Sequence, residues 1–135
     1  ITQQLAKNIY FTQEKKLERK IAETFMAFKL ENQYGKDEIL ELYVNIIYFG
    51  SGYYGVYDAS QGYFGKPPSE MTDYESTLLA GLPNAPSVYS PDVSPELSAQ
   101  RHQQVLARMV DCDYITEEES QAITANLNVV LKGEK

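Results

Sequence analysis

A chain of 135 residues is long enough for one domain with a buried core. Its single cysteine, Cys112, excludes an internal disulfide, and its single histidine, His102, is too few for an ordinary zinc or iron centre. The formal charge of −7 disfavours binding to nucleic acid. No apolar run reaches the roughly 18 residues that a membrane-spanning helix needs, so the chain as given is expected to be soluble.

Cations gather near the N-terminus of this acidic chain. Residues 1–36 contain seven Lys or Arg and four Glu, a net charge of +3, whereas the remainder carries a net charge of −10. Such a concentration is typical of a surface that faces an anionic ligand, but a solvated helix face gives the same pattern. Charge alone leaves both interpretations open.

Apolar spacing predicts an all-α domain. Apolar residues recur three and four positions apart along most of the chain, and no stretch alternates as a strand would. The first three helices are expected over 1–10, 16–34 and 37–48, with Gly35 ending the second and Asp37 capping the third.

Turn and capping signals divide the rest of the chain. A glycine-rich bend, FGSGYYG, precedes a short helix that ends at Phe64, and a break follows at Pro67 and Pro68. After the helix that is predicted to begin at Thr72 and end near Gly81, the chain is expected to be irregular as far as Pro91. All these segments are expected to pack as a single domain over residues 1–135. Three more helices are predicted. One runs from the Thr72 and Glu75 capping box to about Gly81, and the next from Ser94 with Pro95 to about Cys112. The last runs from the Thr116 and Glu119 capping box to about Leu127.

The second predicted helix has two contrasting faces at about 100° per residue. One face is an apolar stripe that we expect to be core. On the opposite face a carboxylate lies among cations, so Glu23 is expected to stay ionised at neutral pH. A salt-bridged solvent face would give the same pattern. The stripe consists of Leu17, Ile21, Phe25 and Phe28, and the charged face of Lys16, Arg19, Lys20 and Glu23.

The third predicted helix, DEILELYVNIIYF, is apolar on most of its circumference. A helix of this kind is central, and we expect Leu42 and Ile46 to be buried. Its polar residues Glu41, Asn45 and Tyr48 are four and three positions apart and share one edge. That edge either faces solvent or lines a cleft, and spacing does not decide between them.

Four segments in order resemble the signatures of a known family. They are similar to the second to fifth motifs of the peptidoglycan glycosyltransferases (glycosyltransferase family 51), which occur in bifunctional class A penicillin-binding proteins and in monofunctional transglycosylases. The resemblance covers nearly the whole chain and implies an all-α, lysozyme-like helical domain. The segments are ITQQLAKN, RKIAE, KDEILELYVNIIYFGSGYYGVYDASQGYFGK and LLAGLPNAPSVYSP.

The resemblance assigns roles to individual residues. Glu23 corresponds to the second catalytic glutamate, which is not the base but organises cations or the pyrophosphate, and Arg19 and Lys20 support it. Lys15 corresponds to a basic position near the lipid pyrophosphate, an anion that cations and amide donors bind strongly. The other implied substrate-binding residues are Gln3, Gln4, Lys7 and Asn8 on the donor side of the cleft, with Asn45 and Tyr48 from the third helix.

The implied activity is polymerisation of lipid II into β-1,4 glycan strands with release of undecaprenyl pyrophosphate. The implied partners are lipid II, the growing glycan chain, moenomycin-type inhibitors and the membrane, with no nucleic acid. The implied cofactor is at most a divalent cation, magnesium or manganese, with no organic cofactor. The parent protein is expected at the outer face of the bacterial cytoplasmic membrane.

The chain departs from the family pattern at its N-terminus. The first motif, whose Glu-Asp pair carries the catalytic base, is not found in this sequence, and the second motif lacks its usual Gly-Gly-Ser-Thr opening. We therefore expect a lysozyme-like domain truncated at the N-terminus and inactive alone. A muramidase-type hydrolase is an alternative, but it needs a second carboxylate, which Glu23 does not evidently have. A second alternative is a non-catalytic helical module that binds cell-wall proteins.

Overall fold

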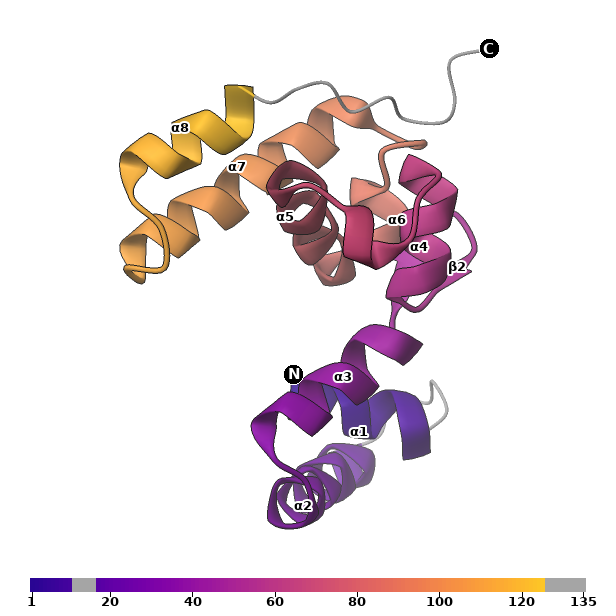
Figure 1. Ribbon diagram of the computed structural model, residues 1–135. Helices are drawn as coiled ribbons and strands as arrows, with labels where there is room; N and C mark the ends of the chain where they lie inside the picture. The colour runs from indigo at the N-terminus through magenta and orange to yellow at the C-terminus, as the bar shows by residue number, and fades with distance from the viewer. Residues whose placement is uncertain (11–16, 126–135) are drawn as a thin grey trace. The chain divides into compact units, whose positions relative to one another are not determined.

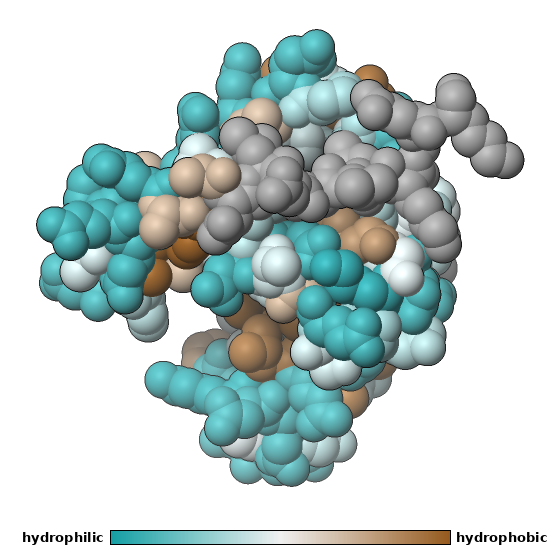
Figure 2. Space-filling model, turned by 45° about the horizontal axis from the view of Figure 1, so that its top comes forward, coloured by the Kyte–Doolittle hydropathy of each residue, from teal (hydrophilic) through white to brown (hydrophobic). Residues whose placement is uncertain are grey.

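The computed structural model describes residues 1–10 and 17–125, without the side chains of Leu17 and Arg19. Within these ranges the chain forms eight α-helices, two short 3-10 helices and one two-stranded hairpin. The helices cluster into two compact units, Ile1–Ile47 and a second unit that begins at Tyr48. In the described ranges no helix is both long and apolar enough to cross a membrane. The face of the molecule in Figure 2 is largely hydrophilic, as the negative net charge suggests.

The first unit is built around its N-terminal helix. Figure 1 shows α1 lying against both α2 and α3. Leu5 and Ala6 of α1 are completely buried, and Ile39 and Tyr43 of α3 are buried with them. The three helices are α1 (Thr2–Tyr10), α2 (Leu17–Gln33) and α3 (Lys36–Ile46).

The ends of these helices fall within two residues of the predicted positions, but the N-cap residue of α3 is not the predicted one. Gly35 holds the N-cap position, so the prediction that Asp37 caps this helix is wrong, and Asp37 lies in its first turn. The Glu38 carboxylate accepts a hydrogen bond of 2.8 Å from the backbone N–H of Gly35, which satisfies a backbone donor at the start of the helix. Because α3 ends at Ile46, Tyr48 is not on the helix that was expected to carry it.

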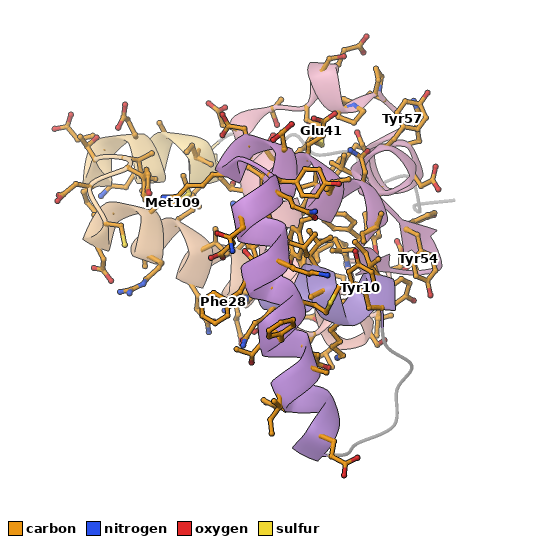
Figure 3. All side chains as sticks on the ribbon, turned by 90° about the horizontal axis from the view of Figure 1, so that it is seen from below. Tyr10, Phe28, Glu41, Tyr54, Tyr57 and Met109 are labelled. Carbon is orange, nitrogen blue, oxygen red and sulfur yellow. The ribbon has the colours of Figure 1, made fainter. Side chains whose placement is uncertain are left out.

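The predicted core face of α2 is wrong. Ile21, Phe25 and Phe28 expose 68%, 67% and 63% of their surface, and the buried face carries Glu23, Ala27 and Leu30 instead. Figure 3 shows Phe28 standing out from the side of α2. Periodicity identifies an apolar stripe, but only the positions of the neighbouring helices decide which stripe is covered.

The predicted core face of α3 is wrong for the same reason, because the neighbouring helices decide which face is covered. Leu42 and Ile46, expected to be buried, are each 37% exposed. The inward face of α3 is formed by Ile39 and Tyr43, and Ile47 is buried just after the helix ends. On a helix that is apolar almost all round, sequence does not distinguish the face that packs from its neighbour.

The second unit is a helical assembly with a small hairpin at its start. In Figure 1, α7 lies beside α5, and α8 folds back along α7. The completely buried Leu82 and the buried Leu78, Leu79 and Leu106 belong to its core. The elements are β1 (Tyr48–Gly50), β2 (Tyr53–Tyr54), α4 (Val56–Phe64), η1 (Pro68–Glu70), α5 (Asp73–Gly81), η2 (Leu82–Asn84), α6 (Pro86–Tyr89), α7 (Pro95–Asp111) and α8 (Glu117–Ala125).

The predicted helix starts in this unit are confirmed. The Thr72 hydroxyl accepts from the backbone N–H of Glu75, whose carboxylate accepts from the N–H of Thr72 at 2.7 Å. Thr116 and Glu119 form the same reciprocal pair, and the hydrogen bonds from Thr116 lower the pKa of the Glu119 carboxyl. Ser94 caps α7, with Pro95 at the first helical position. The predicted end of the last helix near Leu127 lies outside the described residues.

Two features of this unit differ from the prediction. The glycine-rich bend contains an antiparallel hairpin in which Tyr48 pairs with Tyr54 and Gly50 with Tyr53. Gly50 has φ 95°, and a Cβ there would lie 2.7 Å from the Pro86 carbonyl oxygen, so glycine is required. The stretch predicted to be irregular contains the helical turns η2 and α6. Strands of two or three residues are too short to show an alternating pattern.

Candidate functional site

The side chain of Gln3 connects α1 to α2. Its Nε2 donates a hydrogen bond of 3.0 Å to the Thr24 hydroxyl, which donates in turn to the backbone carbonyl of Lys20 at 3.0 Å. The amide is therefore held in place between two helices. A fixed amide is a better ligand donor than a freely rotating one, because less side-chain entropy is lost on binding.

Gln4 connects α1 to α3 in a similar way. The Tyr43 hydroxyl donates to Gln4 Oε1 at 3.1 Å. Burial raises the pKa of Tyr43, so the hydroxyl stays protonated and remains a donor at neutral pH. With its Oε1 engaged, Gln4 keeps its Nε2 group for other acceptors. The two neighbouring glutamines thus fix α1 to both other helices of the first unit.

Glu23 lies on the buried face of α2. Only 8% of its surface is exposed, and it shares that face with Ala27 and Leu30. Carboxylates are seldom this buried in proteins unless a partner compensates for lost solvation, so the burial of Glu23 marks it as a candidate functional residue. The position of Glu23 next to Thr24 places it beside the residue that holds Gln3.

Gln3 and Gln4 are exposed, and the remaining predicted residues whose side chains are described in the first unit also lie on its surface. Lys7 and Asn8 are exposed at the end of α1. Asn45 is exposed on α3, where its side-chain amide donates to the backbone carbonyl of Glu41 at 2.8 Å. Lys20 lines an open groove of about 480 Å³ together with Ile21, Thr24, Phe25 and Phe28.

Three predicted residues lie apart from this arrangement. Lys15 is outside the described residues, and only the backbone of Arg19 is described, as part of α2. Tyr48 belongs to the second unit, where its ring contacts that of Tyr54 at a centroid separation of 4.8 Å. The structure therefore brings Gln3, Gln4 and Glu23 into one three-helix unit, with the two glutamines exposed and Glu23 buried.

A divalent cation held by protein ligands alone does not fit the described residues. Within 1–10 and 17–125, no three side chains of His, Cys, Asp or Glu come together as a metal site would require.

Sequence reasoning missed Thr24 and Tyr43, which position the two glutamines. The signal for Tyr43 was available, because a tyrosine on a buried helix face needs a partner for its hydroxyl. Thr24 carried no comparable signal, since its role depends on how closely α1 approaches α2.

Comparison with known proteins gives consistent matches. A family model described as "Transglycosylase" matches residues 1–110. The chain is 50% identical over 130 residues to penicillin-binding protein 1A of Aquifex aeolicus, covering 96% of this chain and 18% of that protein. It is 46% identical over 125 residues to penicillin-binding protein 1F of Bacillus subtilis, covering 93% of this chain and 17% of that protein.

A solved structure shows the same fold. The crystal structure of penicillin-binding protein 1A from Haemophilus influenzae superposes with a TM-score of 0.62 and 49% sequence identity, over 65% of this chain and 13% of that one. With the helices described above, this similarity confirms the predicted all-α, lysozyme-like fold class. The chain spans less than a fifth of the length of the relatives described here.

Proposed function

The chain belongs to the transglycosylase family, and from this premise we propose that its parent protein polymerises lipid II into peptidoglycan glycan strands at the outer face of the bacterial cytoplasmic membrane. The observation that carries the proposal is the buried Glu23, on a helix that hydrogen bonds fix to α1 within the matched segments. The relatives are penicillin-binding proteins, which supports a role in the cell wall.

The proposed reaction is a glycosyl transfer with inversion. The 4-hydroxyl of the lipid-linked acceptor attacks C1 of the reducing-end sugar of the growing chain. The new β-1,4 bond forms as the bond from C1 to the phosphate oxygen breaks, and undecaprenyl pyrophosphate leaves with the bonding electrons. The acceptor hydroxyl loses its proton to a general base, which we assign to the glutamate of the family's first motif.

This chain would act mainly on the leaving group. Lys7 and Lys15 would neutralise the departing pyrophosphate with support from Arg19 and Lys20, and Glu23 would help to organise the site. The amides of Gln3, Gln4 and Asn8, with Asn45 and Tyr48, would hold the sugar and phosphate oxygens. Pre-positioned donors of this kind stabilise charge that develops in the transition state.

The test is substitution of Glu23 in the full-length parent protein. Glu23→Gln removes the charge but keeps the shape, and we expect polymerisation of labelled lipid II to fall by about 10² to 10³. Glu31→Gln is the matched control, because Glu31 is exposed on the same helix. Near-normal polymerisation by a correctly folded Glu23→Gln protein would remove the assigned role.

The 135-residue chain alone is expected not to polymerise lipid II. Without general-base help the rate falls by about 10² to 10⁴. The purified chain would be incubated with labelled substrate beside the full-length protein. Glycan produced at a comparable rate would show that the base lies within these residues.

A further inference from the structure

A groove of about 890 Å³ lies within the second unit, and we name it the α5–α8 groove. It is bounded by Lys66, by the start of α5, by Met109 near the end of α7 and by residues of α8. Figure 3 shows Met109 where α7 and α8 lie side by side. Ligand sites in proteins have volumes of about 300 to 1,000 Å³, so this groove is large enough for several side chains of a partner.

Part of the groove lining is apolar. Four of its apolar side chains, Met71, Met109, Ile115 and Ile123, are half-buried. Methionine is unbranched and flexible, so it adapts to apolar groups of different shapes. Apolar side chains that remain partly in contact with water are stabilised when apolar groups of a partner cover them.

The charged part of the lining is acidic. Asp73 and Glu119 are exposed in the first turns of α5 and α8. Lys66 is the one cation among the lining residues that the structure describes, and its ammonium lies 3.0 Å from the Glu75 carboxylate, which offsets its charge. The adjoining segment 111–119 contains five carboxylates and no Lys or Arg. The groove therefore has a negative charge.

Two of these carboxylates are held in place because they cap helices. The Glu75 carboxylate accepts from the backbone N–H of Thr72 at 2.7 Å, and that of Glu119 accepts from the N–H of Thr116 at 2.7 Å. The helix starts thus already have carboxylates close to the N–H groups that attract anions elsewhere. An added anion would be repelled, whereas a cation would be attracted.

We propose that the α5–α8 groove docks a basic amphipathic segment of a partner protein. Its apolar side chains would cover the half-buried methionines and isoleucines, and its Lys or Arg side chains would lie opposite Asp73 and Glu119. A helix suits this role, because its apolar side chains recur three and four positions apart and its cations lie beside them. The lining contains none of the residues to which glycosyl transfer is assigned, so the two proposals are independent.

The same charges disfavour two other occupants. A second copy of this chain has a formal charge of −7 and would be repelled by the acidic groove. An anionic lipid surface attracts basic segments, and the carboxylates of the groove are of the opposite kind. A basic protein segment is the occupant that fits both the charge and the apolar lining.

The experiment uses the 135-residue chain and, as probe, a synthetic amphipathic peptide of leucine and lysine with about four helical turns. Titration followed by ¹H–¹⁵N NMR should shift the amides of residues 71–77 and 117–123 in a saturable way. The affinity should fall as the salt concentration rises, because the contributing carboxylates are exposed.

Paired variants separate the groove from general attraction by an acidic chain. The Asp73→Asn, Glu119→Gln double variant should weaken binding by about fivefold. Glutamine also serves in a capping box, so the start of α8 is retained. The matched control is Glu117→Gln with Glu118→Gln, which removes the same charge from exposed positions of α8 outside the described lining. It should change the affinity by less than about twofold.

An apolar variant tests the other half of the proposal. Ile123→Ala leaves the charge unchanged and should weaken binding by about threefold, because it removes apolar surface from the lining. Circular dichroism would verify that each variant keeps its helices.

Three outcomes would overturn the proposal. The first is no saturable shift with the leucine–lysine peptide. The second is an equal loss of affinity in the Asp73→Asn, Glu119→Gln variant and in its control, which would assign the binding to general electrostatic attraction. The third is equal binding of a peptide in which glutamate replaces every lysine. None of these outcomes bears on polymerisation by the Glu23→Gln parent, so failure here is distinguishable from failure of the proposed function.

Discussion

The two units bury their apolar side chains to different extents. Among the described residues, ten large apolar or aromatic side chains are exposed in the first unit, which has 47 residues, and six in the longer second unit. In the second unit α5 packs against both α7 and α8, and its apolar residues are mostly covered. In the first unit Ile21, Phe25 and Phe28 of α2 remain exposed.

This difference shows that the number of neighbouring helices decides how much of a helix's apolar surface is covered. Each helix of the second unit has several neighbours, so most of its apolar faces are covered. The first unit has three helices only, and the two that pack on α2 leave the face of Phe25 outside. Because a larger share of its large apolar side chains is exposed, we expect the first unit to be the less stable of the two.

The largest predicted effects concern the two cores. Leu5→Ala in the first unit and Leu82→Ala in the second both remove completely buried side chains. Each should lower the free energy of unfolding by about 2 to 5 kcal/mol. Leu42→Ala should cost about 1 kcal/mol or less, because Leu42 is partly exposed. Urea unfolding followed by circular dichroism measures all three, and a Leu42→Ala cost equal to that of Leu5→Ala would contradict the assigned core.

A smaller effect is expected at a partly buried ion pair of the second unit. The Glu75 carboxylate lies 3.0 Å from the Lys66 ammonium and also caps α5 at Thr72. Glu75→Ala removes both interactions and should destabilise the chain by about 1 to 3 kcal/mol. Glu118→Ala, at an exposed position in the first turn of α8, is the control. Equal thermal stability of the two variants would show that the pair contributes nothing.

The smallest effect is a pH dependence from His102. This side chain is buried, its Nε2 lies 2.7 Å from the Thr77 hydroxyl, and its ring meets that of Tyr74 edge-on. Burial lowers the pKa of His102 below its ordinary value of about 6.5. The folded chain therefore binds this proton less readily than the unfolded chain does. Stability should be full above about pH 6.5 and should decline as the pH falls toward the lowered pKa.

The measurement compares unfolding free energies at pH 7.5 and 5.5 in the chain and in His102→Gln. His102 is the only histidine of the sequence, so the variant should lose most of the decline. An undiminished decline in His102→Gln would assign the effect to other groups.

Local chemistry explains how much of this structure could be predicted. The starts of α5, α7 and α8 were predictable because Thr72, Ser94 and Thr116 bond to backbone groups within three residues. The hairpin was not, since it depends on the backbone of Gly50 fitting beside Pro86, a residue distant in sequence.

For the site, the motif segments identified Gln3, Gln4 and Glu23 as functional candidates, but not their surroundings. The angular pattern of α2 put Glu23 among cations, whereas the structure buries it beside Ala27 and Leu30. The burial of Glu23 depends on contacts between α2 and α1, which the spacing of residues along the sequence does not reveal. The roles of Lys7 and Lys15 remain predictions.

The most direct test of the account is the orientation of α2, because it decides whether Glu23 lies inside the first unit. Single cysteines would be placed at Phe25 and at Ala27 in a chain whose exposed Cys112 is replaced by serine. Thiol labelling under native conditions should be fast for Phe25→Cys and roughly 100-fold slower for Ala27→Cys. Fast labelling of Ala27→Cys with protection of Phe25→Cys would place the apolar stripe inside and Glu23 outside, and would contradict the account.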